Sequence, residues 1–201
     1  HAFHSCTSLE CVRIPSSVTT IGECAFSECA KLSHVAIPEE GRLEAIRRYA
    51  FYGCVSLTEI TLPRSLSHFG GCSAFQGCSR LTRVDLANTV LVAIEETTFY
   101  DCNSLEDVHL PVTLKRIGTK AFKDCTSLST IILHEGTTTI DTWAYHRCKN
   151  LSIDKLPSTL ETIGCGAFDS CNLRHFVSPL HCKELHISAF DRCEDLKSIQ
   201  I

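Results

Sequence analysis

Apolar positions recur in one fixed order along the chain. An aromatic residue is followed after three positions by Cys and after six by Leu, as in Phe51, Cys54 and Leu57. From the Leu the pattern continues as L-x-x-I/V-x-I/L, here through Ile60 and Leu62. Alternating apolar positions rich in β-branched residues predict a short strand with one buried face.

This order is repeated nine times, with successive cysteines 22 to 25 residues apart. A constant period of this length is typical of repeat proteins that stack one structural unit on the next. The nine aromatic–Cys pairs are Phe3/Cys6, Phe26/Cys29, Phe51/Cys54, Phe75/Cys78, Phe99/Cys102, Phe122/Cys125, Tyr145/Cys148, Phe168/Cys171 and Phe190/Cys193.

The second half of each repeat has its own regular positions. All six prolines lie six residues after the repeat's Leu, where a residue without an N–H donor ends the strand. Two further apolar rows follow, one of Val or Leu such as Leu114 and one mostly of Ile such as Ile117. Gly22, Gly70, Gly118 and Gly164 come directly after the second row. A permissive residue there predicts a turn.

A single copy of this unit cannot bury its own apolar side. Stacking the copies buries it, with each repeat contacting only its neighbours. We therefore predict an extended solenoid in which every aromatic and every Cys row forms a ladder along the stack.

The repeat resembles the BspA-type, or Treponema-type, leucine-rich repeat, in segments such as IPSSVTTIGECAFSECAKL and LPVTLKRIGTKAFKDCTSL. This resemblance implies a leucine-rich-repeat solenoid of about nine repeats of 22–25 residues. It also implies a parallel β-sheet on the concave face, and short strands, turns or 3-10 segments on the convex side. Many similar proteins are surface or secreted proteins implicated in adhesion and protein binding, so the resemblance favours such a location. No catalytic residues accompany this family.

Three positions depart from the repeat pattern. Asp154 stands where the strand requires Ile or Val, with Ile153 one place early. Thr137 and Cys182 replace the first apolar residue of the second half. These departures predict local irregularity within the same fold.

Composition and charge narrow the function classes. The net charge is −4, which provides no electrostatic footprint for nucleic acid or anionic lipid. No run of 18 apolar residues is present, so membrane insertion is not expected. We expect residues 1–201 to form one leucine-rich-repeat domain. Because the chain opens and stops within a repeat without polar caps, we expect it to be part of a longer chain.

The 14 cysteines divide into the ladder of nine and five others. A regularly filled row favours packing, because free Cys behaves as a small buried hydrophobe. Short disulfides between a non-ladder and a ladder Cys remain an alternative, and they would imply an oxidising compartment. Zinc is disfavoured because C-x-x-C is absent. The pairs considered for the short disulfides are Cys24–Cys29, Cys72–Cys78 and Cys165–Cys171.

Catalytic motifs are absent from the sequence. It contains no G-x-S-x-G, H-E-x-x-H or glycine-rich phosphate loop. Nine equivalent cysteines argue against one special nucleophile, since a buried thiol is inert. We therefore expect neither an enzyme nor a protein with a cofactor or a metal.

Any binding site is expected on the outward strand positions, two and four residues after each Leu. A charged group there consists of Glu59, Arg83, Asp85, Asp107 and His109. Toward the C-terminus the same rows contain Ile132, Ile153 and Val177, which would form an exposed apolar patch. The alternative interpretation is a solvated face whose charges satisfy one another, with Arg83 between acids.

Two functions fit these residues. The first is a non-catalytic protein-binding or adhesion module that presents its concave surface to a macromolecular partner. The alternative is a structural scaffold subunit that holds a larger assembly together. The partner is expected to be a protein, because all ten Phe residues belong to framework rows and leave no stacking platform for bases.

Overall fold

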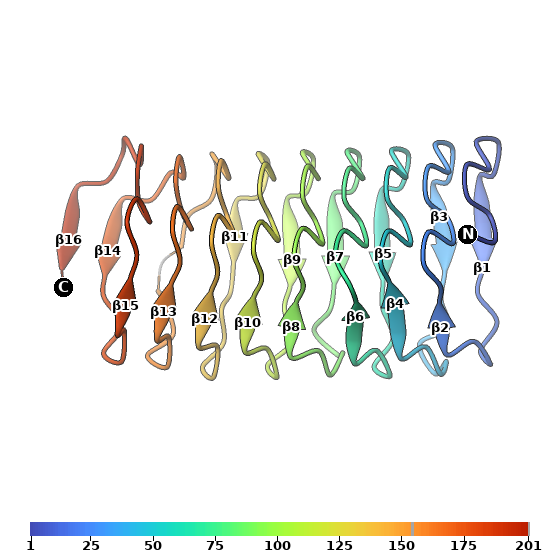
Figure 1. The fold of residues 1–201 in the computed structure, drawn as a ribbon, viewed down its shortest axis with the longest axis horizontal. Helices are drawn as coiled ribbons and strands as arrows, with labels where there is room; N and C mark the ends of the chain where they lie inside the picture. The colour runs from blue at the N-terminus through green and yellow to red at the C-terminus, as the bar shows by residue number, and fades with distance from the viewer. Residues whose placement is uncertain (154, 201) are drawn as a thin grey trace.

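The computed structural model describes residues 1–153 and 155–200 and is a parallel β-solenoid (Figure 1). Each repeat makes one turn of the stack, and most repeats contribute a short strand to each of two ladders. The two chain ends lie at opposite ends of the stack (Figure 1). The arms between strands are turns and bends, and the described residues contain no helix of any kind. The expected short strands and turns are thus present, whereas the expected 3-10 segments are not.

The first ladder, called the Leu-side ladder, is formed by the strands that follow each repeat's Leu. They pair in parallel as β1-β3, β5-β7-β9-β11 and β14-β16. The strands are β1 (Cys11–Arg13), β3 (His34–Ala36), β5 (Glu59–Thr61), β7 (Arg83–Asp85), β9 (Asp107–His109), β11 (Thr130–Ile131), β14 (His175–Val177) and β16 (Ser198–Gln200).

The second ladder, called the Ile-side ladder, is formed by the strands that contain the Ile row. They pair in parallel as β2-β4-β6 and β8-β10-β12-β13-β15. The strands are β2 (Thr20–Ile21), β4 (Ala45–Arg47), β6 (His68–Gly70), β8 (Ala93–Ile94), β10 (Arg116–Ile117), β12 (Thr139–Ile140), β13 (Thr162–Ile163) and β15 (Glu184–Leu185).

Equivalent residues of successive repeats pair with one another in both ladders. Val84 pairs with Val108 on the Leu side, and Ile117 pairs with Ile140 on the Ile side. This register places each apolar row inside the stack, where the rows form one continuous core. The predicted translational stacking is confirmed.

The aromatic row forms a ladder of stacked rings through the middle of the core. Neighbouring rings from Phe3 to Phe190 have centroids 5.2 to 5.5 Å apart and are nearly parallel. From Phe51 to Phe168 these side chains are fully buried. The repeats on either side of each ring therefore shield it from solvent.

The Cys row satisfies backbone acceptors as well as filling space. Each ladder thiol from Cys29 onward donates its S–H to the carbonyl of the aromatic residue in the preceding repeat, at 3.0 to 3.2 Å. Each of these carbonyls also accepts the backbone N–H of the Cys in its own repeat, at 3.0 to 3.2 Å. The thiol is therefore a second, weaker donor to the same oxygen, which a row of Ala would lack. All 14 cysteines are free thiols in the structure, including those of the three pairs considered above.

Thr137 fits the apolar row that it interrupts. Its side chain is fully buried, and its hydroxyl donates to the carbonyl of Leu114 at 3.1 Å. A buried hydroxyl costs little when it has such a partner, so this departure from the repeat leaves the fold regular.

Tyr145 carries the one hydroxyl in the aromatic ladder. Its ring is fully buried between Phe122 and Phe168, and the hydroxyl has no hydrogen-bond partner. An unpaired buried hydroxyl costs about 1–3 kcal/mol. We therefore expect Tyr145→Phe to raise the free energy of unfolding by about 1–2 kcal/mol, measured by urea denaturation. No change, or a loss of stability, would show that the hydroxyl has a partner in solution.

Candidate functional site

The predicted charged group lies on the outer surface of the Leu-side ladder, on β5, β7 and β9. Arg83 donates to Glu59 at 2.9 Å, and both side chains are largely exposed. Asp85 and His109 pair in register on β7 and β9. The structure thus brings all five predicted charged residues together on three adjacent strands.

His109, and not Arg83, lies between the acids. Its Nε2 is 3.2 Å from Asp107 and its Nδ1 is 3.9 Å from Asp85. Arg83 contacts Glu59 alone among the described acidic groups. The Arg83–Glu59 pair is electrically balanced, so the remaining charge of this group belongs to Asp85 and Asp107 when His109 is neutral.

Two of the three predicted apolar residues are exposed on the same face. Ile132 is 71% exposed and Val177 is 60% exposed. Ile153 is different, because it is partly buried and packs against the core. The expectation that Ile153 points outward was wrong.

A shift in register explains the position of Ile153. Ser152 pairs with Thr130 in an isolated bridge, although Ser152 follows Leu151 directly while Thr130 is two residues after Leu128. Shifting the pairing by one residue moves each side chain to the other face. Ile153 therefore occupies the inward position that Asp154 would have filled, and Asp154 itself lies outside the described residues.

Three adjoining hollows form a groove along this face, hereafter the Leu-side groove. The first, of about 280 Å³, is lined by Asp107, His109 and Ile132 among others. The second, of about 460 Å³, shares Ile132 with the first and adds Leu156. The third, of about 370 Å³, shares Leu156 with the second and ends at Val177.

The floor of the Leu-side groove is apolar, and its rim contains both polar and apolar side chains. Leu110, Ile131, Leu133 and Phe176 belong to the core and line its base. Leu180, on the rim of the third hollow, is 86% exposed. Sequence reasoning missed Leu180 and Leu156, because both lie beyond the strand rows to which the search was confined.

Charges within the second hollow offset one another. It is lined by Glu135 and Lys155. The backbone N–H and hydroxyl of Ser158 donate to the Glu135 carboxylate at 3.1 and 2.9 Å. These hydrogen bonds, with a smaller contribution from Lys155, hold the pKa of Glu135 below its usual range. Glu135 is therefore ionised at neutral pH and balances Lys155.

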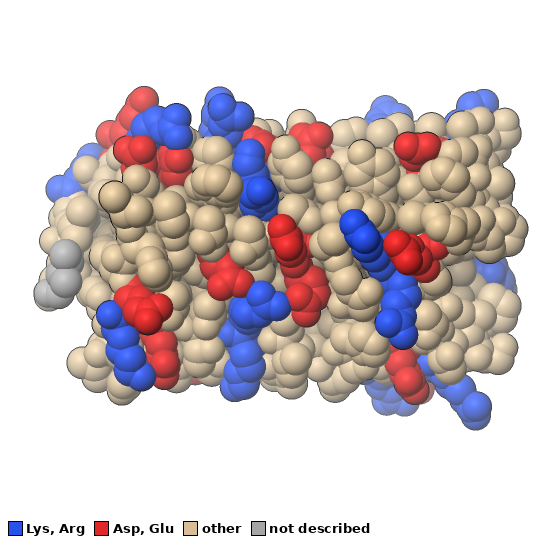
Figure 2. Space-filling view, viewed as in Figure 1, with Lys and Arg blue, Asp and Glu red and all other residues tan. Residues whose placement is uncertain are grey.

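The opposite, Ile-side face pairs its charges across repeats. Arg116 on β10 donates to Glu95 and to Asp141, each at 2.8 Å, and so connects three successive repeats. Lys183 contacts Glu161 at 3.1 Å. Figure 2 shows this face, where blue and red side chains lie next to each other rather than in patches of one sign. The face is best explained as a solvated surface whose charges satisfy one another.

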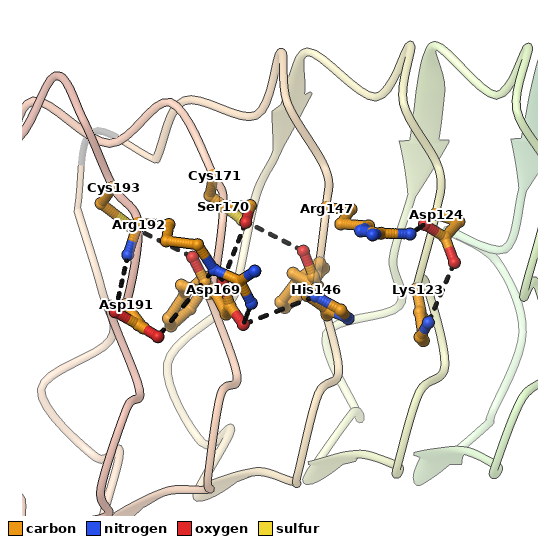
Figure 3. Close-up of polar contacts among 12 residues, drawn as sticks. Lys123, Asp124, His146, Arg147, Asp169, Ser170, Cys171, Asp191, Arg192 and Cys193 are labelled. Atoms are coloured by element: carbon orange, nitrogen blue, oxygen red, sulfur yellow. Dashed lines mark hydrogen bonds and ion pairs between the residues drawn. The ribbon is translucent and has the colours of Figure 1, made fainter.

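A second polar cluster lies on the turns between the aromatic and Cys rows (Figure 3). Asp169 is only 5% exposed, and Arg192 of the next repeat binds it through two nitrogens at 2.6 and 3.0 Å. These hydrogen bonds from Arg192, together with that from Ser170, outweigh the effect of burial and lower the pKa of Asp169. Sequence reasoning missed this cluster, although opposite charges in neighbouring turns of successive repeats could have revealed it.

His146 lies on the other side of Asp169, with its Nε2 3.5 Å from the carboxylate (Figure 3). Both ring nitrogens are buried without a hydrogen-bond partner. Burial lowers the pKa of His146 below 6.5, and this effect, with repulsion from Lys123 and Arg147, exceeds the attraction of Asp169 and Asp124. The folded protein therefore keeps this imidazole neutral.

This neutral imidazole predicts a loss of stability in acid. Below about pH 6.5 His146 of the unfolded chain takes up a proton, whereas the buried imidazole of the folded chain resists protonation. The stability that the neutral imidazole contributes is therefore fully present above that pH and declines below it. We expect His146→Gln to lose less stability than the native chain on acidification below this pH. Urea denaturation of both proteins across this pH range is the measurement. Parallel pH profiles would contradict the expectation.

The cysteine ladder offers no reactive thiol at its centre. Burial raises the pKa of Cys54 to about 12 and raises that of Cys102 well above its usual range. Thiols in this state are poor nucleophiles. Among residues 1–153 and 155–200, no three His, Cys, Asp or Glu side chains are placed to hold a metal ion.

A parallel stack of repeats with a regular Leu row, a regular Cys row and short strands in two ladders defines the class of leucine-rich-repeat solenoids. A family model described as the BspA type leucine rich repeat region matches six copies within residues 1–92 and 71–197. The chain belongs to this BspA-type leucine-rich-repeat family, which confirms the resemblance seen in the sequence. No curated protein matches the chain.

Solved bacterial structures share the fold. A leucine-rich repeat protein from Bacteroides ovatus is 31% identical with a TM-score of 0.89, and the match covers 100% of this chain and 51% of that one. One from Eubacterium ventriosum is 25% identical with a TM-score of 0.74, covering 82% of this chain and 43% of that one. The T. pallidum leucine rich repeat protein is 35% identical with a TM-score of 0.55, and the match covers 85% of this chain and 67% of that one.

The chain therefore spans about half the length of the first two of these proteins. Among its described residues, no helix is present that could cross a membrane.

Proposed function

We propose that this chain is a non-catalytic protein-binding or adhesion module that presents the Leu-side face to a macromolecular partner. The observation that carries this proposal is the Leu-side groove, whose apolar floor is open to solvent beside Asp107, with Asp85 on the neighbouring strand β7. Exposed apolar surface of this kind on a rigid scaffold is typical of protein contact sites. On the Ile-side face, by contrast, the charges of Arg116 and Lys183 are paired across repeats.

Family membership supports the same proposal. Solenoids of stacked repeats commonly bind macromolecules along an extended surface. Display at the cell surface or secretion agrees with adhesion, and we propose it as the location of the protein. The residues proposed to contact the partner are Glu59, Arg83, Asp85, Asp107, His109, Ile132 and Val177; Ile153 contributes to the groove wall and not to the exposed surface.

Site-specific photo-crosslinking in the native source tests this function. The full-length protein would carry p-benzoyl-phenylalanine in place of Thr61, an exposed residue of β5, or in place of Lys115, an exposed residue on the Ile side. We expect protein adducts from the Thr61 position and few or none from Lys115. Adducts from Lys115 alone, or equally from both positions, would refute the assignment of the Leu-side face.

A further inference from the structure

Charge is distributed unevenly along the Leu-side groove. Among the described residues that line it, the fixed charges are those of Asp107, Glu135 and Lys155. Glu135 and Lys155 line the same hollow and offset each other. The net charge of the groove is therefore negative, and it is concentrated at the end near β9, where Asp85 adds to Asp107.

The first hollow joins this negative end to apolar surface. Asp107 and His109 form part of its wall, while Leu110, Ile131 and Ile132 provide apolar contacts. A Lys or Arg side chain has the matching form, because its aliphatic stem can cover apolar surface while its charged end reaches a carboxylate. The side chains of Asp85 and Asp107 are 40% and 45% exposed, so a cation can approach each carboxylate from solvent, beside the His109 ring that lies between them.

The remaining two hollows are mostly apolar and extend toward β14. Leu156 lines both, and Val177 and Leu180 border the far end. Successive strands are about 4.8 Å apart, so the three intervals from β9 to β14 measure about 14 Å. An extended chain covers this distance with about four or five residues at roughly 3.3 Å each.

We propose that the Leu-side groove binds an extended segment of a partner protein that carries one basic residue, Lys or Arg, at the β9 end, adjacent to three or four apolar residues. This inference rests on the proposed function and specifies the chemistry of the partner. The basic residue contacts Asp107 and Asp85, and the apolar residues cover Ile132, Leu156 and Val177.

Titration of the isotopically labelled chain with short peptides tests this proposal. The probes are acetyl-Lys-Val-Leu-Val-Ser-Ser-amide and the same peptide with Glu in place of Lys, detected by backbone amide chemical shifts. We expect shifts at groove residues such as Thr130 and Ile132, and binding of the Lys peptide about tenfold tighter than that of the Glu peptide. Equal affinities, shifts outside the groove or no binding of either peptide would each overturn the proposal.

Variants of the chain separate the charged contact from the apolar one. Asp107→Lys should reverse the preference between the two peptides, whereas Ile132→Ser should weaken both peptides by a similar factor of about three to ten. Glu96→Gln removes an exposed acid far from the groove and should change neither affinity. An Asp107→Lys chain that is folded and still prefers the Lys peptide refutes the assigned contact.

The two experiments fail independently. Adducts at Thr61 without any peptide preference would leave the Leu-side face as a protein contact surface and refute only the chemistry assigned to its groove. Peptide binding in the groove without adducts from native partners would refute the proposed function instead.

Discussion

Phe122→Ala should lower the free energy of unfolding by about 3–5 kcal/mol, the cost of removing a fully buried large aromatic side chain. The ring is 0% exposed and stacks on Phe99 and Tyr145, with both centroid distances at 5.4 Å. The surrounding rings cannot move into the space, because each is fixed by its own repeat. The truncation therefore leaves a cavity in the middle of the ladder, and urea denaturation measures its cost.

Phe3→Ala is the matched control at the same repeat position. Phe3 is 48% exposed and stacks on Phe26 alone among the ladder rings. Its truncation should cost only about 1 kcal/mol. Similar losses for the two variants would mean that the ring row does not form the centre of the core.

Gly164→Ala should lower stability by about 3 kcal/mol, even though alanine is smaller than most residues in the chain. A Cβ at Gly164 would lie 2.5 Å from the backbone nitrogen of Thr142 and 2.6 Å from the backbone carbonyl carbon of Asp141. Both atoms belong to the preceding turn, so relief of the clash requires the two turns to separate. Denaturation with urea again provides the measurement.

Gly22→Ala and Gly70→Ala place the same methyl group at the same repeat position. A Cβ at Gly22 meets no atom within 4 Å, and one at Gly70 meets only the flexible side chain of Arg47. We expect Gly22→Ala to raise stability by about 0.5 kcal/mol, because alanine restricts the unfolded chain more than glycine does. Gly70→Ala should have a small effect. A destabilisation at Gly22 equal to that at Gly164 would show that backbone preference, and not contact between turns, determines the result.

The fold could be predicted from the sequence because each repeat contains the same order of apolar positions. Rows such as Phe99, Phe122 and Tyr145 carry the same information nine times, so a single departure does not obscure it. The shift at Ile153 could not be predicted, because burial of Ile153 had to be weighed against regular pairing of the strand. In the structure, burial of the isoleucine determined the register.

The candidate site was predicted only in part. Charged positions on β5, β7 and β9 follow directly from strand alternation, so their common face was predictable. Which acid contacts which base was not, since His109 and Arg83 reach different neighbours through side-chain conformations that the repeat does not encode. The groove depends on where Leu156 and Leu180 lie relative to the strands, and this position is set by the arms between them.

The interruptions of the two ladders occur at different levels of the stack. The Leu-side sheets end between β3 and β5 and between β11 and β14, whereas the Ile-side sheet ends between β6 and β8. At the level of each interruption the other ladder is continuous, as in β2-β4-β6 and β12-β13-β15. A solenoid bends most easily at a level where neither ladder has hydrogen bonds between successive strands. Because the interruptions are staggered, the two ladders are never interrupted at the same level. Under a pulling load along its axis, the chain should therefore resist as one stiff, cooperative element, without a preferred breaking point between blocks.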